Sequence, residues 1–357
     1  MLTGLFKNTK IAGLSVAVPT GKVAVETFNS VFGEENVAKF IEMTGVNSVS
    51  RAIPEQTASD LGYEAAVDVL QNSSVSKSDI GILVFVSQKP DYRSPSTAFV
   101  LHKRLGLSEN CVCFDLNLAC SGFIFGLQTV LSLLENSTSK AALLITGDTS
   151  VKTLSPHERT MIMLFGDSGS ATLLEKSENE NPIKLAFRTD GSRFKSIITP
   201  AGAYRNRDLQ KERTAWSDDI MRSDYDTHMK GMDVFGFSIT DVPLLMKDFL
   251  ALQEKTPEDY DYFVLHQANN YILKQLSRKL KIPTEKIPVS LDRFGNNSSN
   301  SIPLVLADHF GTNNHGKINI FICGFGAGLS FACGDLRIDT QIINPLIETD
   351  AFYKDAF

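Results

Sequence analysis

The stretch Asp115-Leu116-Asn117-Leu118-Ala119-Cys120-Ser121-Gly122-Phe123 joins two kinds of apolar pattern. Residues 111–118 alternate as a half-buried strand does, whereas residues 123–135 repeat apolar side chains at helical spacing. A cysteine at such a junction lies at a helix N-terminus, where unpaired backbone N–H groups and the helix dipole favour a thiolate over a thiol. The stretch therefore predicts that Cys120 is a nucleophile.

The other cysteines suit a structural role, because a free cysteine more often packs as a small hydrophobic side chain. Cys111 and Cys113 alternate within the strand pattern, and Cys323 and Cys333 flank a glycine cluster. No histidine or second close cysteine pair accompanies Cys111 and Cys113, so no metal site is expected. Five cysteines in a chain this long do not form a disulfide framework, which predicts a cytoplasmic protein.

The composition indicates a soluble protein with a large hydrophobic core. The chain has 357 residues, 43% of them hydrophobic, and strand-like and helix-like segments alternate along nearly all of it. This predicts an α/β protein of two domains or one doubled domain. No signal peptide or membrane span is expected. A net charge of −6 without a basic, aromatic-interleaved stripe argues against nucleic-acid binding.

Two successive α/β series of similar size suggest a duplicated fold, inferred from the order of the elements alone. The predicted strands are 11–18, 80–86, 111–118, 141–146, 171–175, 262–265, 318–323 and 330–336. The predicted helices are 26–44, 59–70, 97–105, 123–135 and 271–280, and the second series begins around 234–252. We expect an N-terminal half over 1–177, a connector with insertions over 178–230 and a C-terminal half over 231–357.

Two further polar segments interrupt apolar stretches. His266, in Leu265-His266-Gln267-Ala268-Asn269, follows a buried strand and precedes a helix, where an imidazole can face a cleft or simply pack. Asn296, in Gly295-Asn296-Asn297-Ser298-Ser299, is equally consistent with a helix cap or an Asx turn. The glycine cluster 324–328 fits an ordinary turn. Their joint occurrence after Cys120 indicates a Cys-His-Asn site.

With Phe165-Gly166-Asp167 before a strand, these segments resemble the β-ketoacyl-acyl carrier protein synthase III family of the thiolase superfamily, over most of the chain. The strongest matches are Ala119 to Phe123, His266 to Asn269, Gly295 to Ser298 and Gly324 to Leu329. The resemblance implies a five-layered αβαβα fold with duplicated halves and a homodimer. It also implies an acyltransferase of fatty acid biosynthesis that condenses an acyl thioester with malonyl-acyl carrier protein, with loss of CO2.

The resemblance implies a role for each matching residue. Cys120 would take the acyl group, His266 and Asn296 would donate to the enolate left by decarboxylation, and the backbone N–H groups of Cys120 and Ala327 would bind the later oxyanion. Arg159 matches the family's adenine-stacking arginine, and Phe325 and Gly326 would contact substrate. This chemistry needs no metal or redox cofactor. Its substrates would be an acyl-coenzyme A or acyl-carrier protein and malonyl-acyl carrier protein.

Several positions depart from the family pattern. Lys39 and Met43 stand where relatives commonly have tryptophan and arginine, Met232 replaces an asparagine, and Tyr271 replaces an arginine after the histidine motif. These changes argue against an ordinary acyl-coenzyme A primer and predict an unusual primer, with delivery on carrier protein as an alternative to coenzyme A. Ser94, where relatives often place an aromatic residue, predicts a roomier acyl pocket.

A basic group lies on the helix that follows His266. It comprises Lys274, Arg278 and Lys279, followed by Lys281 and Lys286 at the helix exit. The pattern fits either an ordinary solvated helix face or a dock for an acidic partner. The family resemblance favours acyl carrier protein as that partner.

Alternatives remain within and outside the superfamily. A biosynthetic thiolase needs a second cysteine where Phe325 stands, whereas a polyketide-type synthase shares the three site residues. A papain-like hydrolase also has the order Cys, His, Asn, but Cys120 lacks that family's local setting. The trypsin-like run Gly166-Asp167-Ser168-Gly169 lacks the paired cysteines of a secreted protease. A catalytically inactive scaffold would have lost one of the three residues, and none is lost.

Overall fold

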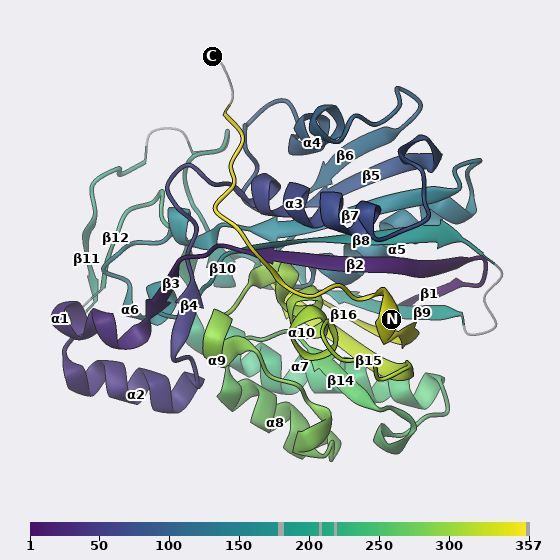
Figure 1. Ribbon diagram of the computed structural model, residues 1–357. Coiled ribbons are helices and arrows are strands. Elements are labelled where there is room, and N and C mark those ends of the chain that lie inside the picture. Colours follow the sequence, from purple (N-terminus) through teal and green to yellow (C-terminus); the bar gives the residue numbers. More distant parts are fainter. Residues whose placement is uncertain (178–181, 207–208, 218–219, 355–357) are drawn as a thin grey trace.

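Two stacked β-sheets form the centre of the protein, and Figure 1 shows them in a computed structural model that describes residues 1–177, 182–206, 209–217 and 220–354. The six-stranded sheet has the order β17-β2-β8-β7-β5-β6, and the five-stranded sheet has the order β1-β9-β16-β15-β14. In the same order, the strands of the six-stranded sheet are Ile347–Glu348, Thr9–Val18, Ser168–Lys176, Ala141–Asp148, Ile80–Val86 and Val112–Leu116. Those of the five-stranded sheet are Leu2–Phe6, Ile183–Thr189, Ser330–Asp339, Lys317–Gly326 and Tyr262–Leu265.

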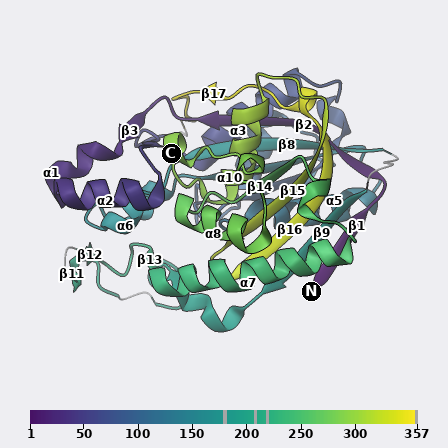
Figure 2. The same ribbon diagram turned by 90° about the horizontal axis from the view of Figure 1, so that it is seen from below.

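Helices fill the space between the sheets and cover both outer faces, which gives five layers (Figures 1 and 2). Helices α3 (Ala58–Gln71) and α4 (Thr97–Leu105) cover the six-stranded sheet, and α5 (Gly122–Glu135) and α10 (Ser301–Phe310) lie between the sheets. Helices α7 (Gly231–Leu252) and α8 (Asn270–Leu280) cover the five-stranded sheet. The predicted five-layered αβαβα architecture is confirmed.

Three apolar cores hold these layers together. The central core packs Phe123 and Leu127 of α5 against strands of both sheets, which is why this helix is apolar on nearly every side. The outer cores join α3 and α4 to one sheet and α7 and α8 to the other. Each fully buried side chain of this size contributes about 1.5–3 kcal/mol, so α5 is fixed firmly at the end that carries Cys120.

Strong local signals predicted the elements well. Strands 80–86 and 262–265 and helix 97–105 agree with the structure to the residue. The predicted helix 26–44 is wrong as one element, because Gly33 has φ +83° and separates α1 (Asn29–Phe32) from α2 (Glu34–Thr44). A 3-10 turn, Val25–Phe28, precedes α1. A positive φ is accessible to glycine without strain, so the chain turns there.

Each sheet includes one strand from the end of the chain that forms most of the other sheet. β1 pairs antiparallel with β9 in the five-stranded sheet, whereas β17 near the C-terminus pairs parallel with β2. The first residues of the expected connector, 178–181, lie outside the described residues, and the connector also supplies β9, an internal strand. The three-part division remains a prediction, and sheet membership crosses its limits.

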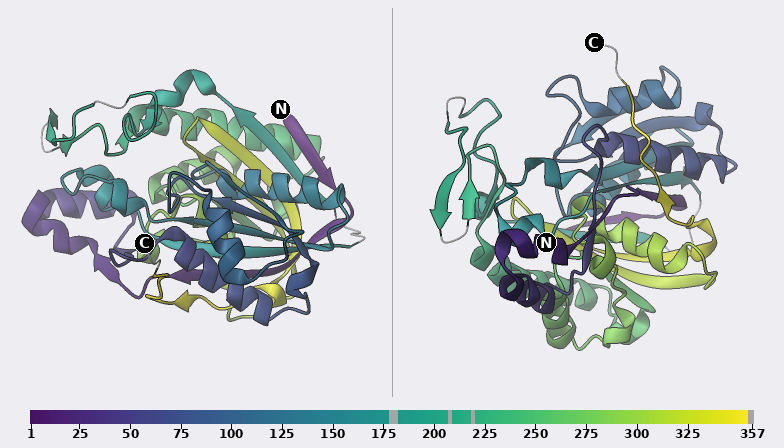
Figure 3. Two further views of the ribbon diagram at one scale, coloured as in Figure 1. Left: turned by 90° about the horizontal axis from the view of Figure 1, so that it is seen from above. Right: turned by 60° about the vertical axis from the view of Figure 1, so that its left-hand side comes forward.

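The rest of the connector forms small β-ribbons beside the sheets. Strands β10 (Ile197–Ile198) and β13 (His228–Met229) pair, as do β11 (Thr214–Ser217) and β12 (Ile220–Arg222) (Figure 3). The remaining short elements are β3 (Lys22–Ala24), β4 (Ser48–Ser50), α6 (Arg159–Ile162), α9 (Leu291–Phe294) and the 3-10 helices 77–79, 150–153, 191–196, 257–259, 284–286, 298–300 and 340–342. Among the described residues, no helix has the length and apolarity needed to cross a membrane.

Candidate active site

Cys120 lies between the carboxyl end of β6 and the start of α5, as the sequence predicted. Strands β6, β5 and β7 run parallel, so the segments that follow them meet at one edge of the sheet. Strand β15 approaches this point closely, because a Cβ added to Gly326 would lie 2.7 Å from Cys120 Cβ and 3.2 Å from its Sγ. Only glycine permits that approach.

His266 is held in place directly after β14. Its ring is 2% exposed, and its backbone N–H donates to the Cys323 carbonyl at 2.8 Å. The Phe325 ring packs edge-on against the imidazole, with centroids 5.2 Å apart. Burial lowers the pKa of His266 to about 3, so the imidazole is neutral throughout the physiological range.

The hydroxyl of Ser301 decides which imidazole nitrogen carries the proton. Ser301 Oγ lies 3.1 Å from His266 Nδ1 and 3.1 Å from the Ser298 carbonyl oxygen. In the structure the hydroxyl donates to that carbonyl, which also accepts the backbone N–H of Ser301 and so keeps a partner when the single hydroxyl proton is given to Nδ1 instead. With the hydroxyl proton on Nδ1, the proton of the neutral ring sits on Nε2, which can then donate to a ligand.

Asn296 is oriented by the loop that follows α9. Its Oδ1 accepts the backbone N–H of Ser298 at 3.0 Å, and because that N–H can only donate, the amide oxygen must face it. The Nδ2 amino group is then directed to the other side. The Asn296 backbone is fixed by bonds to Leu164 and Gly166 at 2.8 and 3.0 Å. The side chain is 5% exposed.

One cavity of about 520 Å³ is lined by Cys120, His266 and Asn296, together with Phe325 and Gly326. Three segments far apart in the sequence therefore converge as the motif order suggested. At the mouth of this cavity, Met43, Met232 and Tyr271 are 67%, 80% and 49% exposed. The entrance is apolar at the positions that depart from the family pattern.

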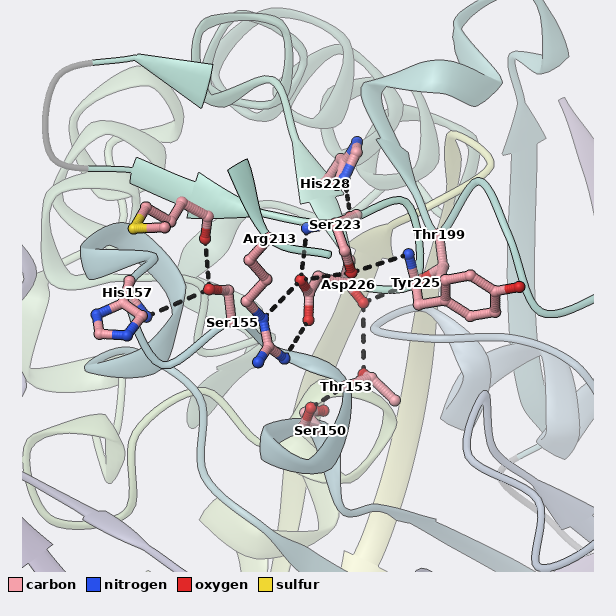
Figure 4. A network of polar contacts seen from close by, with 12 residues as sticks. Ser150, Thr153, Ser155, His157, Thr199, Arg213, Ser223, Tyr225, Asp226 and His228 are labelled. Atoms are coloured by element: carbon pink, nitrogen blue, oxygen red, sulfur yellow. Dashed lines mark hydrogen bonds and ion pairs between the residues drawn. The ribbon is translucent and has the colours of Figure 1, made fainter. Parts of the chain in front are cut away.

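A second, smaller cavity of about 50 Å³ also touches Cys120. Ala327 lines it, in the hairpin between β15 and β16, along with the 3-10 turn Ser150–Thr153. The connector holds this turn, because the Thr227 N–H donates to the Thr153 carbonyl at 2.9 Å. The adjacent Asp226 forms a two-pronged ion pair with Arg213 at 2.8 and 3.0 Å (Figure 4). The connector is thus part of the cavity wall, which sequence reasoning missed.

The expectation of a resting thiolate is wrong for this structure. Burial raises the pKa of the Cys120 thiol to about 12, and the Asp148 carboxylate also raises it. The hydroxyl of Ser298, 3.9 Å from Sγ, and the cysteine's own backbone N–H lower the pKa without compensating. Desolvation of the anion outweighs the helix N-terminus, so Cys120 rests as a thiol.

This raised pKa predicts a steep pH dependence of Cys120 alkylation. Below the pKa the thiolate fraction grows tenfold per pH unit, so the rate of carbamidomethylation by iodoacetamide should rise about tenfold from pH 7 to pH 8 and again from pH 8 to pH 9. Mass spectrometry of the Cys120 peptide measures the rate, and denatured protein is the control. A plateau below pH 8 would contradict the prediction.

The remaining predicted residues lie outside the two cavities. Arg159 is half-buried on α6 and does not line the larger cavity, whereas its neighbour Thr160 does. Lys274 and Arg278 are exposed on α8, whereas the ammonium of Lys279 donates to the Ile239 carbonyl on α7. Sequence reasoning missed four polar residues around Cys120 and His266, because single polar residues at element ends carry no pattern. They are Lys89, Asp148, Ser298 and Ser301.

Two stacked sheets of this topology, with a helix between them that brings a cysteine to a shared cavity, define a condensing acyltransferase of the thiolase fold. Residues 114–191 match the model of 3-oxoacyl-[acyl-carrier-protein] synthase III, and residues 250–338 match that of its C-terminal part. The chain belongs to the 3-oxoacyl-acyl carrier protein synthase III family. The predicted family and enzyme class are confirmed, and the hydrolase alternative is not supported.

Individual relatives match nearly the whole chain. A putative 3-oxoacyl-[acyl-carrier-protein] synthase 3 from Campylobacter jejuni is 31% identical over 352 residues, 96% of this chain and 98% of the relative. A β-ketoacyl-[acyl-carrier-protein] synthase III from Clostridium perfringens is 31% identical over 334 residues, 93% of this chain and all of the relative. The crystal structure of a 3-oxoacyl-(acyl-carrier protein) synthase from Burkholderia xenovorans aligns with a TM-score of 0.92 and 32% identity, covering 98% of this chain and 99% of the other.

Proposed function

We propose that the enzyme transfers an acyl group from a thioester to Cys120 and then condenses it with malonyl-acyl carrier protein, releasing CO2 and a 3-oxoacyl-acyl carrier protein. The observation that carries this proposal is the shared cavity of Cys120, His266 and Asn296. In the first step the Cys120 sulfur bonds to the acyl carbonyl carbon and the thioester C–S bond breaks. The proton of the resting thiol leaves with the departing thiol, so charge balances.

In the second step the malonyl C–C bond to the carboxylate breaks, CO2 leaves, and its electron pair remains on the thioester as an enolate. His266 Nε2 and Asn296 Nδ2 donate hydrogen bonds to the enolate oxygen. Both groups are fixed before the charge develops, by Ser301 and by the Ser298 backbone respectively. Fixed donors of this kind contribute about 3–4 kcal/mol each in a dry site.

In the third step the enolate carbon attacks the acyl carbonyl on Cys120. The tetrahedral oxyanion would lie between the backbone N–H groups of Cys120 and Ala327, two residues that line the small cavity. Collapse breaks the bond to sulfur and releases the product, and the Cys120 thiolate left behind takes a proton from water to return to the resting thiol. These steps use protein donors and one nucleophile, so the proposed reaction needs no metal or redox cofactor.

We propose acyl carrier protein as the partner that delivers the malonyl group, and a homodimer as the working assembly. Strand β6 supports the dimer, because it ends the six-stranded sheet with β5 as its single neighbour among the described strands, and Val112 on it is 59% exposed. An open edge strand invites pairing with a second copy.

All five cysteines are free, which supports a cytoplasmic location. The primer carrier, coenzyme A or carrier protein, stays open.

The proposed reaction is tested by intact-mass spectrometry in two stages. Protein mixed with a panel of acyl thioesters should gain the mass of one acyl group on Cys120. Addition of malonyl-acyl carrier protein should remove that mass and give 3-oxoacyl-acyl carrier protein. Transfer of the acyl group to water instead would contradict a condensing role.

We propose that Lys274 and Arg278, one turn apart on α8, bind the acidic surface of the carrier protein. Tyr271 on the same helix lines the cavity mouth, so a carrier docked there would direct its prosthetic arm inward. The double substitution Lys274→Glu and Arg278→Glu should raise KM for malonyl-acyl carrier protein about tenfold at low salt, with kcat little changed. Steady-state condensation assays measure both constants.

The matched control for this docking prediction is Lys103→Glu. Lys103 is exposed on α4, in the layer that covers the other sheet, so this charge reversal should leave KM unchanged. A second control uses a small malonyl thioester without carrier protein, for which the double variant should match the wild type. An equal loss with the small thioester would show that the substitutions damage the active site instead.

A further inference from the structure

The small cavity beside Cys120 has a mixed wall, in which seven polar residues and seven apolar residues join Cys120. The polar residues come from the end of β7, from the segments after β5 and β7, from the connector and from the Ser298 loop. They are Gln88, Lys89, Asp148, Ser150, Thr153, Thr227 and Ser298. Its volume of about 50 Å³ has room for about four water-sized groups, since each needs roughly 10–15 Å³. A long acyl chain does not fit this volume.

Lys89 and Asp148 reach the cavity because β5 and β7 are neighbouring parallel strands. Asp148 ends β7 and is 1% exposed. Its Oδ1 accepts from Ser87 Oγ and from Gln88 N–H, both at 3.1 Å, and its Oδ2 accepts from Ser299 Oγ at 3.0 Å. Ser87 Oγ in turn accepts the backbone N–H of Lys89 at 2.8 Å, so the lysine backbone is fixed to the wall.

The N–H groups of the Lys89 ammonium are available to donate hydrogen bonds. Within the described residues it makes no hydrogen bond or ion pair, and its side chain lines the cavity. Burial lowers the pKa of Lys89, an effect that the nearby Asp148 carboxylate opposes. Lys89 is only partly buried, so water can solvate its ammonium. An apolar acyl group in the cavity would displace that water and leave the ammonium without an acceptor, which is costly.

The charge of Asp148 decides which kind of hydrogen-bond acceptor binds best to Lys89 in this cavity. The acceptor sites of Asp148 are largely occupied, but its negative charge remains close to the cavity. A carboxylate on the acyl group would gain from Lys89 and lose to Asp148 in a low-dielectric site. A neutral oxygen accepts from Lys89 without that repulsion.

We infer that the small cavity selects a short acyl group that carries a neutral oxygen substituent, and that Lys89 donates a hydrogen bond to this oxygen. The inference rests on the acyl transfer to Cys120 proposed above and names the class of primer. Lys89 is then a specificity-determining residue. This role explains a lysine at position 89 better than simple neutralisation of the Asp148 charge does, because neutralisation alone would not distinguish one primer from another.

The test compares matched primers as N-acetylcysteamine thioesters, which avoid any dependence on a carrier. Butyryl, 3-hydroxybutyryl, 4-hydroxybutyryl and succinyl thioesters are offered to wild type and to Lys89→Met, and the rate of Cys120 acylation is followed by intact mass. At least one hydroxybutyryl thioester should react about 10- to 100-fold faster than butyryl with wild type, as expected for a charge-assisted hydrogen bond. Lys89→Met should remove that preference, so that within the variant the ratio of the hydroxybutyryl rate to the butyryl rate falls to about one.

Lys103→Met is the control for loss of a lysine, and thermal unfolding verifies that each variant is folded. Equal rates for butyryl and both hydroxybutyryl groups with wild type, or a preference for succinyl, would overturn the inference while leaving the condensing function intact. An equal fall for all four primers in Lys89→Met would assign Lys89 to neutralising Asp148 and also overturn it. Failure of all four thioesters to acylate Cys120 would overturn the proposed function and the inference together.

Discussion

Replacing Cys120 with alanine is expected to abolish acylation and to lower condensation at least about 10³-fold. The sulfur is the atom that carries the acyl group between the two half-reactions, and no other described side chain in the shared cavity is a comparable nucleophile. Intact mass with any accepted thioester should show no acyl adduct on Cys120→Ala. Product analysis with malonyl-acyl carrier protein should show almost no 3-oxoacyl product.

The same variant should still decarboxylate malonyl-acyl carrier protein. Enolate formation depends on His266 and Asn296, and neither is held in place by Cys120. Release of CO2 with formation of acetyl-acyl carrier protein therefore separates the two half-reactions in one protein. Cys111→Ala is a matched control, because that cysteine packs in an outer core away from the cavity. Condensation at more than about a tenth of the wild-type rate in Cys120→Ala would remove the cysteine from the mechanism.

The sequence predicted the elements that carry the site better than the chemistry of the site. The run 80–86 is apolar throughout with turn residues on both sides, and it forms β5 with those limits. The position of Cys120 followed from the change between two periodicities. Its resting protonation state did not, because burial by β15 and by the Ser298 loop depends on contacts between distant segments.

Other features were hidden for a similar reason. Lys89 and Asp148 are 59 residues apart, and only the parallel pairing of β5 with β7 brings them to the same cavity. Strands β1 and β9 were missed, since β1 pairs with β9 and β9 lies in the segment that we expected to be a connector. Ser301 is the first residue of α10, and nothing in its sequence setting indicates that its hydroxyl lies against His266. Such pairings are properties of topology and not of any local pattern.

Replacing His266 or Asn296 with alanine is expected to lower malonyl decarboxylation about 10²–10³-fold each and to leave Cys120 acylation within about threefold of wild type. Each donor acts on charge that exists only after CO2 begins to leave, so its loss affects that step alone. Because both donate to one oxygen, the double variant should lose less than the product of the two single effects. Loss of acylation in the single variants would instead give these residues a role in the first step.

The pH profile distinguishes a neutral imidazole from a charged one. With a pKa of about 3, His266 stays neutral from pH 5 to pH 9, so decarboxylation by Cys120→Ala should be flat across this range. If the imidazolium were the donor, the rate would fall as pH rises through about 6.5. Ser301→Ala adds a second measurement, because without the hydroxyl at Nδ1 the ring can place its proton on either nitrogen. Decarboxylation should then fall about threefold to tenfold, and Ser301→Thr, which keeps a hydroxyl, should restore it.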